Sequence, residues 1–231
     1  IDSSFGIYVS NSTSGGGNFI FRDYDLGNRW RCLYIIQGRD YVVEDNNFTN
    51  SGINDPSPAL YIQGVLSDNL PNGLQASGNL FGGTNANSGI YLIQMSDIKF
   101  SNAPAADVQF VIEDASGLNT LNTQSALRLD FCSNIVVDNI DVSKSIAGIS
   151  GRGIAINNGT ADGNISITNC TIQNRRTGID IIGGVDYTIT GNDLTSSGQD
   201  NNEPAIELNN VRGNLIPKGV TASNNAFGGT G

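Results

Sequence analysis

The segment Ile165-Ser-Ile-Thr-Asn-Cys-Thr-Ile172 decides the fold of this 231-residue chain, because its pattern recurs in seven other segments. Apolar side chains at the first and third positions are separated by a polar one, as in a strand that buries one face. The fifth position, Asn169, is a residue type that tolerates a left-handed backbone conformation. The pattern therefore predicts a short strand that ends in a sharp corner.

The copies of this segment share two polar positions. The other copies begin at Phe19, Tyr41, Leu74, Ile98, Ile135, Tyr187 and Val220. The fifth position is always Asn, Asp or Gly: Asp23, Asp45, Gly78, Asn102, Asn139, Asn169, Gly191 and Asn224. The sixth position is Asn in four copies: Asn46, Asn79, Asn192 and Asn225. These amides are predicted to stack inside the fold as an Asn ladder, interrupted at Ile140 and Cys170.

A second alternating strand precedes each copy, and the full repeat is about 25 to 37 residues long. Coils of this length that stack in parallel bury a core that one coil alone could not form. We therefore predict an all-β fold, a parallel β-helix of about eight coils with three strands per coil. It is expected to be a single domain over residues 1-231, with a long inserted loop at 106-126.

The whole chain resembles the right-handed parallel β-helix repeat proteins of the pectin-lyase-like superfamily. The clearest matches are Gly153-Ile-Ala-Ile156 before Asn164-Ile-Ser-Ile-Thr-Asn169, and Gly178-Ile-Asp-Ile181 before Tyr187-Thr-Ile-Thr-Gly-Asn192. The resemblance implies a right-handed β-helix. It also implies that any polysaccharide would lie along the outward side chains of the first strand of each coil. Enzymes, tailspikes and non-catalytic surface proteins all share this architecture.

The outward column of those first strands begins with four of the chain's seven tyrosines, Tyr8, Tyr34, Tyr61 and Tyr91. One interpretation is a glycan-binding platform of aromatic rings and hydroxyls. The alternative is a cross-strand aromatic ladder that only stabilises the sheet. The two interpretations are compatible.

The later coils of the same face carry the candidate catalytic residues Arg128, Asp130, Asp180 and Glu207. The carboxylates of Asp180 and Glu207 are expected to approach to about 5 Å, near the spacing of a retaining glycosidase. They could instead share calcium, the one cofactor that the sequence leaves open. Nothing in these columns separates the two carboxyls, and Arg152, Arg175 and Arg176 are expected at solvated turns. The chain has no histidine, so a polygalacturonase-like or epimerase-like motif is missing.

Composition narrows the class of partner. A net charge of −10 without a basic run argues against nucleic acid. No apolar stretch reaches the roughly 20 residues of a membrane span.

Cys32, Cys132 and Cys170 have no metal-site spacing and are expected to be buried apolar residues.

The leading hypothesis is a non-catalytic extracellular or cell-surface module, a scaffold, fibre or adhesin segment that contacts carbohydrate or neighbouring subunits. The alternative is a polysaccharide lyase or glycoside hydrolase that acts on the outward face. Because the pattern runs from Ile1 to Gly231 without an evident cap, both ends are expected to adjoin further coils or another copy.

Overall fold

The computed structural model describes most of the repeating core of the chain. The described residues are 5–10, 17–29, 31–49, 51, 58–63, 74–77, 79, 89–93, 96–101, 125–143, 151–157, 165–183, 186–198, 203–209 and 220–228. They form strands, turns and bends. Within these ranges no helix is long and apolar enough to cross a membrane.

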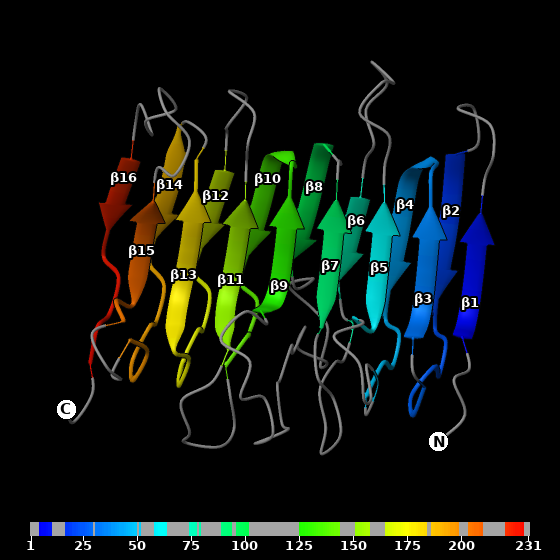
Figure 1. The fold of residues 1–231 in the computed structure, drawn as a ribbon, viewed down its shortest axis with the longest axis horizontal. Coiled ribbons are helices and arrows are strands. Elements are labelled where there is room, and N and C mark those ends of the chain that lie inside the picture. The colour runs from blue at the N-terminus through cyan, green and yellow to red at the C-terminus, as the bar shows by residue number, and fades with distance from the viewer. Residues whose placement is uncertain are drawn as a thin grey trace.

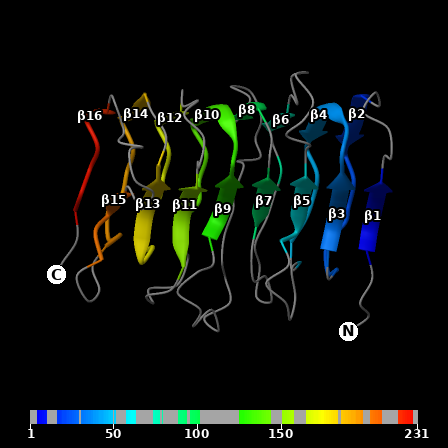
Figure 2. The ribbon, with the colours of Figure 1, turned by 45° about the horizontal axis from the view of Figure 1, so that its top comes forward.

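The strands build two parallel sheets of eight strands each (Figure 1). The odd-numbered sheet contains β1 (Phe5–Ser10), β3 (Arg31–Ile36), β5 (Leu60–Gln63), β7 (Ile90–Ile93), β9 (Ser125–Asp130), β11 (Arg152–Asn157), β13 (Thr177–Ile182) and β15 (Ile206–Asn209). The even-numbered sheet contains β2 (Gly17–Arg22), β4 (Arg39–Glu44), β6 (Leu74–Ser77), β8 (Ser96–Ser101), β10 (Ser133–Asp138), β12 (Ile165–Thr168), β14 (Tyr187–Thr190) and β16 (Val220–Ser223). Each repeat therefore contributes one strand to each sheet, and Figure 2 shows the sheets as two layers.

The pairing register is the one that the repeat predicts. In the odd-numbered sheet Leu33 pairs with Leu60, and Ile154 pairs with Ile179. In the even-numbered sheet Ile165, the first residue of the deciding segment, pairs with both Ile135 and Tyr187. Equivalent positions of successive repeats therefore stack in columns.

A third strand per repeat was expected after each corner, where the described residues form only isolated parallel bridges. The bridges join the seventh positions of neighbouring repeats: Asp25 to Asn47, Asp141 to Thr171, Thr171 to Asp193, and Asp193 to Ala226. These contacts keep the stacking in register without the run of paired residues that defines a sheet.

The corner after each even-numbered strand uses the left-handed backbone conformation predicted for the fifth position. The φ angle is 59° at Asp23, 54° at Asp45, 53° at Asn139, 54° at Asn169, 70° at Gly191 and 55° at Asn224. Gly78 and Asn102 lie outside the described residues. A side chain with a short polar group, or glycine, adopts this conformation at low cost.

The core contains the alternating apolar residues of both sheets together with the Asn ladder. Leu33, Ile35, Ile167 and Ile179 are fully buried. The ladder is present in two pieces: the side chain of Asn46 donates to Oδ1 of Asn79 at 2.9 Å, and that of Asn192 donates to Oδ1 of Asn225 at 3.0 Å. Each of these amides also donates to a backbone carbonyl, those of Phe21, Val43, Ile167 and Ile189 in chain order.

The structure differs from two expectations about single segments and agrees with a third. Arg175 is buried at 2% exposure, not solvated, and its Nε donates to the carbonyl oxygen of Val142 at 2.7 Å. The predicted loop at 106-126 ends two residues too late, because Ser125 and Ala126 belong to β9; residues 106–124 lie outside the described ranges. The three cysteines are buried, as expected.

Candidate functional site

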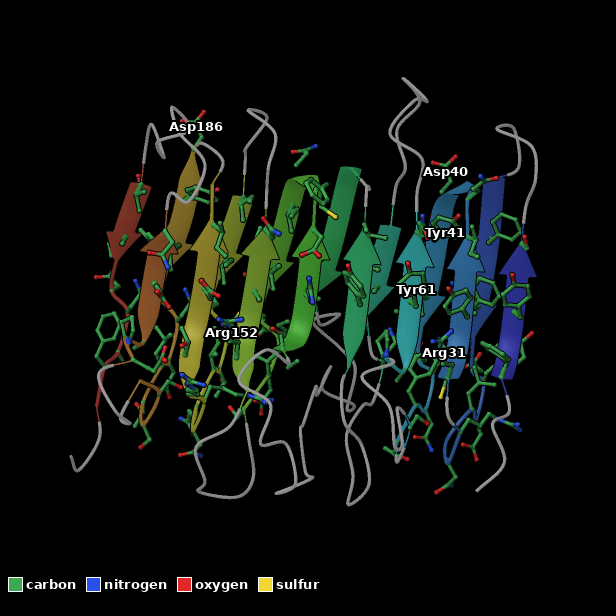
Figure 3. All side chains as sticks on the ribbon, in the orientation of Figure 1. Arg31, Asp40, Tyr41, Tyr61, Arg152 and Asp186 are labelled. Atoms are coloured by element: carbon green, nitrogen blue, oxygen red, sulfur yellow. The ribbon has the colours of Figure 1, made fainter. Side chains whose placement is uncertain are left out.

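The outward side chains of the odd-numbered sheet form one column through all eight repeats. Its members pair in strict register in the order Tyr8, Tyr34, Tyr61, Tyr91, Arg128, Ala155, Asp180 and Glu207. A second column two residues further along contains Asp130, which pairs with Ile93 and Asn157. All the residues proposed from the sequence for the site therefore lie on this face, on which Figure 3 labels Tyr61 and Arg152.

The tyrosines stack on one another along the sheet. Tyr8 and Tyr34 are parallel with centroids 5.5 Å apart, and Tyr34 and Tyr61 are parallel at 4.6 Å. Tyr61 meets Tyr91 edge to face at 5.4 Å. Because the facing surfaces of Tyr34 and Tyr61 cover each other, the column presents ring edges and hydroxyls outward, and the aromatic ladder is present.

Two residues that the sequence did not single out extend the tyrosine end of the face. The guanidinium of Arg31 lies 4.8 Å from the ring centroid of Tyr34 and 5.6 Å from that of Phe5. Phe5 packs edge to face against both Tyr8 and Tyr34. Arg31 precedes the strand pattern by two residues, so its position gave no signal of an aromatic contact.

The four tyrosines form the aromatic half of the column, and the members from Arg128 to Glu207 form its charged half. The two halves meet at Tyr91 and Arg128, whose side chains are in contact. The guanidinium of Arg128 lies 4.7 Å from the ring centroid of Tyr91. Nη2 of Arg128 is 2.7 Å from Oδ2 of Asp130, which is almost fully buried, and the Tyr91 hydroxyl donates to the same oxygen at 2.9 Å. Burial, together with this hydrogen bond to Asp130, raises the pKa of Tyr91 to about 12. The hydroxyl therefore stays protonated and acts as a donor.

Asp180 is held by an arginine that was expected to be solvated at a turn. Arg152 belongs to β11, and its Nε lies 2.8 Å from Oδ2 of Asp180. Arg176 similarly pairs with Glu203. The expectation that nothing distinguishes Asp180 from Glu207 is therefore wrong, since Asp180 has an arginine partner whereas Glu207 accepts a hydrogen bond from the side chain of Asn209.

Asp180 is also only 3% exposed, which changes its acidity. Burial raises its pKa above the ordinary value of 3.8, the charge of Arg152 opposes this rise, and the charges of Glu207 and Glu203 add to it. The net direction is upward. A carboxyl of this kind holds its proton at a higher pH than a solvated one.

A hollow of about 180 Å³ lies over Ala155, at the centre of the charged half. Ala155 lies between Arg128 and Asp180 in the column, so its methyl side chain leaves room between two larger ones. The polar residues that line the hollow are Ser125, Arg128, Asp130, Arg152, Asn157 and Asp180. Sequence reasoning proposed three of these six residues, Arg128, Asp130 and Asp180. It did not predict the hollow, because the hollow depends on the directions in which the arginine side chains extend.

The described residues contain no group of three or more His, Cys, Asp or Glu side chains that could hold a metal ion. Asp180 and Glu207 do pair in register, as the calcium alternative requires. One oxygen of Asp180, however, already contacts Arg152. The arrangement is suited to hydrogen bonding with a polar ligand.

Comparison with known proteins adds no relative. No protein-family model matches the chain, no curated protein matches it, and no solved structure matches it.

Proposed function

We propose that this chain is a non-catalytic module that binds carbohydrate along the outward face of its odd-numbered sheet. In this proposal it is a right-handed parallel β-helix, related in architecture to the pectin-lyase-like superfamily. It acts outside the cell or on the cell surface, as a scaffold, fibre or adhesin segment, because polysaccharide is met there. It needs no cofactor.

The β-helix is supported by the alternation of consecutive strands between two parallel sheets. Each strand returns to its own sheet one position further along, and a parallel crossover of this kind is right-handed in almost all proteins. The left-handed corners and the isolated bridges after them support a third side for the coils whose corners are described.

The observation that carries carbohydrate binding is the in-register column itself. It combines aromatic edges and hydroxyls from Tyr8 to Tyr91 with a polar hollow over Ala155. Ring edges and hydroxyls beside guanidinium donors and carboxylate acceptors offer a sugar both apolar contacts and hydrogen bonds. An extended glycan could contact several repeats at once, because the sheet repeats every ~4.8 Å.

The same proposal includes contact with neighbouring subunits or further coils at the sheet edges. Leu208 is 40% exposed, Val220 41% and Phe227 61%, although their equivalents in inner repeats are buried. A partner stacked on β15 and β16 would cover this apolar surface. Concentration-dependent association in analytical ultracentrifugation, reduced by Phe227→Ser, is the expected result.

Binding to a printed array of neutral, amino, sialylated and uronic glycans tests the proposal. The wild-type chain should bind at least one glycan class, and changing both Tyr61 and Tyr91 to Ala should weaken that binding about tenfold, as the loss of several sugar contacts would. Tyr24→Ala, at an exposed tyrosine outside the column, is the matched control. Wild-type protein that binds no glycan contradicts the proposal.

A second candidate function, glycoside hydrolysis or lyase chemistry, is favoured by one observation. The raised pKa of buried Asp180 gives the face a carboxyl suited to donate a proton, beside Glu207 on the next strand. Incubation with pectin, alginate and xylan, with and without calcium, followed by assays of absorbance near 235 nm and new reducing ends, tests it. Turnover that Asp180→Asn abolishes would establish this alternative in place of the non-catalytic module.

A further inference from the structure

We infer that the hollow over Ala155 is a subsite for one neutral sugar unit, selected through hydroxyl groups that donate to Asp180. This inference rests on the proposed carbohydrate binding and deepens it by naming the class of ligand. The face as a whole does not specify that class, because tyrosine edges accept neutral and acidic sugars alike.

Two buried polar atoms at the hollow lack a hydrogen-bond partner within the described part of the chain. They are Oδ1 of Asp180 and Oγ of Ser125. Both residues line the hollow, and they are 3% and 7% exposed. A buried polar atom without a partner is destabilising, so a ligand that supplies the partner binds more tightly. An ionised carboxylate oxygen accepts only, and a ligand must therefore bring a donor to Asp180.

The charges of the hollow are already balanced. Its two arginines each pair with one of its two aspartates, Arg128 with Asp130 at 2.7 Å and Arg152 with Asp180 at 2.8 Å. Neither pair leaves an arginine positive charge for an acidic group to neutralise. A uronate carboxylate would instead meet two buried carboxylates in a protein of net charge −10.

The remaining polar groups suit a polyol. Asn157 lines the hollow with an amide that both donates and accepts, and the Ser125 hydroxyl can do the same. Ala155 provides a small apolar floor. A hollow of about 180 Å³ has room for a single sugar ring with its hydroxyls.

The test measures binding of wild type, Ala155→Leu and Asp180→Asn to the same glycan array, followed by titration of the best neutral oligosaccharide. Ala155→Leu fills the hollow without a change in charge. Thr188→Leu, an outward and exposed position on β14 in the other sheet, is the matched control. Circular dichroism checks that each variant is folded, and Ala155→Leu keeps the test valid if Asp180→Asn fails to fold.

The inference predicts that wild type prefers neutral over uronic or sialylated glycans, and that Ala155→Leu weakens binding about tenfold, the loss of one or two hydrogen bonds. Thr188→Leu should bind like wild type. Normal glycan binding by Ala155→Leu, or a preference for acidic glycans, overturns the inference while the proposed function stands. A wild-type protein that binds no glycan overturns both.

Discussion

Nε of Arg152 on β11 contacts Oδ2 of Asp180 on β13 at 2.8 Å, across one strand-to-strand step of the odd-numbered sheet. Asp180 lines the polar hollow, and its other carboxylate oxygen, Oδ1, is buried without a hydrogen-bond partner among the described residues. Its burial, together with the charges of Glu207 and Glu203, raises the pKa of Asp180.

Asp180 should make stability fall as the pH rises. A carboxyl whose pKa is higher in the folded state binds its proton more tightly there, so its stabilisation is present below the unfolded value near 3.8 and is lost as the pH rises through the folded value. Asp180→Asn should therefore gain melting temperature relative to wild type between about pH 3 and pH 7.

Asp193 offers a control of opposite sign for that titration. Hydrogen bonds from Thr195 lower its pKa, so its contribution is present above the ordinary value and is lost as the pH falls. Asp193→Asn should lose melting temperature relative to wild type as the pH rises. If the melting temperatures of wild type and Asp180→Asn run parallel over this range, the raised pKa of Asp180 is wrong.

Breaking the Asn ladder should destabilise the fold. Asn192 donates to Ile167 and Asn225 and accepts from the backbone N–H of Cys170, so Asn192→Leu leaves buried partners unpaired. The expected loss is about 1–3 kcal/mol in the free energy of unfolding, measured by urea denaturation. Asn209→Leu, the same change on the outer face, should cost much less; equal losses would contradict an inward ladder.

The corner at Gly191 should accept asparagine and reject valine. Its φ is 70°, and an added Cβ would lie 2.9 Å from Oδ1 of Asn169. Valine is strained in this conformation, which predicts a loss of about 1–3 kcal/mol. Asparagine occupies the equivalent corners at Asn139 and Asn169, so Gly191→Asn should cost less. Thermal melts of the two variants make the comparison, and equal melting temperatures would contradict the assignment.

The cysteines should be unreactive in the folded protein. Burial raises the pKa of Cys32 and of Cys170 to about 12, so the reactive thiolate is scarce at neutral pH. A chromogenic disulfide reagent should titrate no thiol in native buffer and all three in denaturant. Rapid labelling of the native protein would show that the core around them opens readily.

The sequence predicted the sheet pairing and the outward columns because strand alternation has a period of two and the repeat sets the register. Tyr61 beside Tyr91, and Asp180 beside Glu207, follow directly from it. The repeat also predicted the inward Asn ladder, from Asn at its sixth position, and the left-handed corners, from Asn, Asp or Gly at its fifth position.

The arginine contacts could not be predicted in this way. Arg152 has the alternation parity of the buried residues Ile154 and Ile156, yet its long side chain reaches the carboxylate of Asp180. Arg175, assigned to a turn, is buried against backbone carbonyls. A long side chain can extend in several directions, and its neighbours in space decide which one it takes. A repeat pattern contains no information about those neighbours.

The most direct test of the central claim is to map where a glycan binds. A photoreactive derivative of the best array ligand would be cross-linked to the protein, and the labelled peptides identified by mass spectrometry. The account predicts labels on β5 to β13 of the odd-numbered sheet, around Tyr61, Tyr91 and Ala155, and weaker labelling in Ala155→Leu at the same ligand concentration. Labels confined to the outer face of the even-numbered sheet, around Val136 and Thr188, would contradict it.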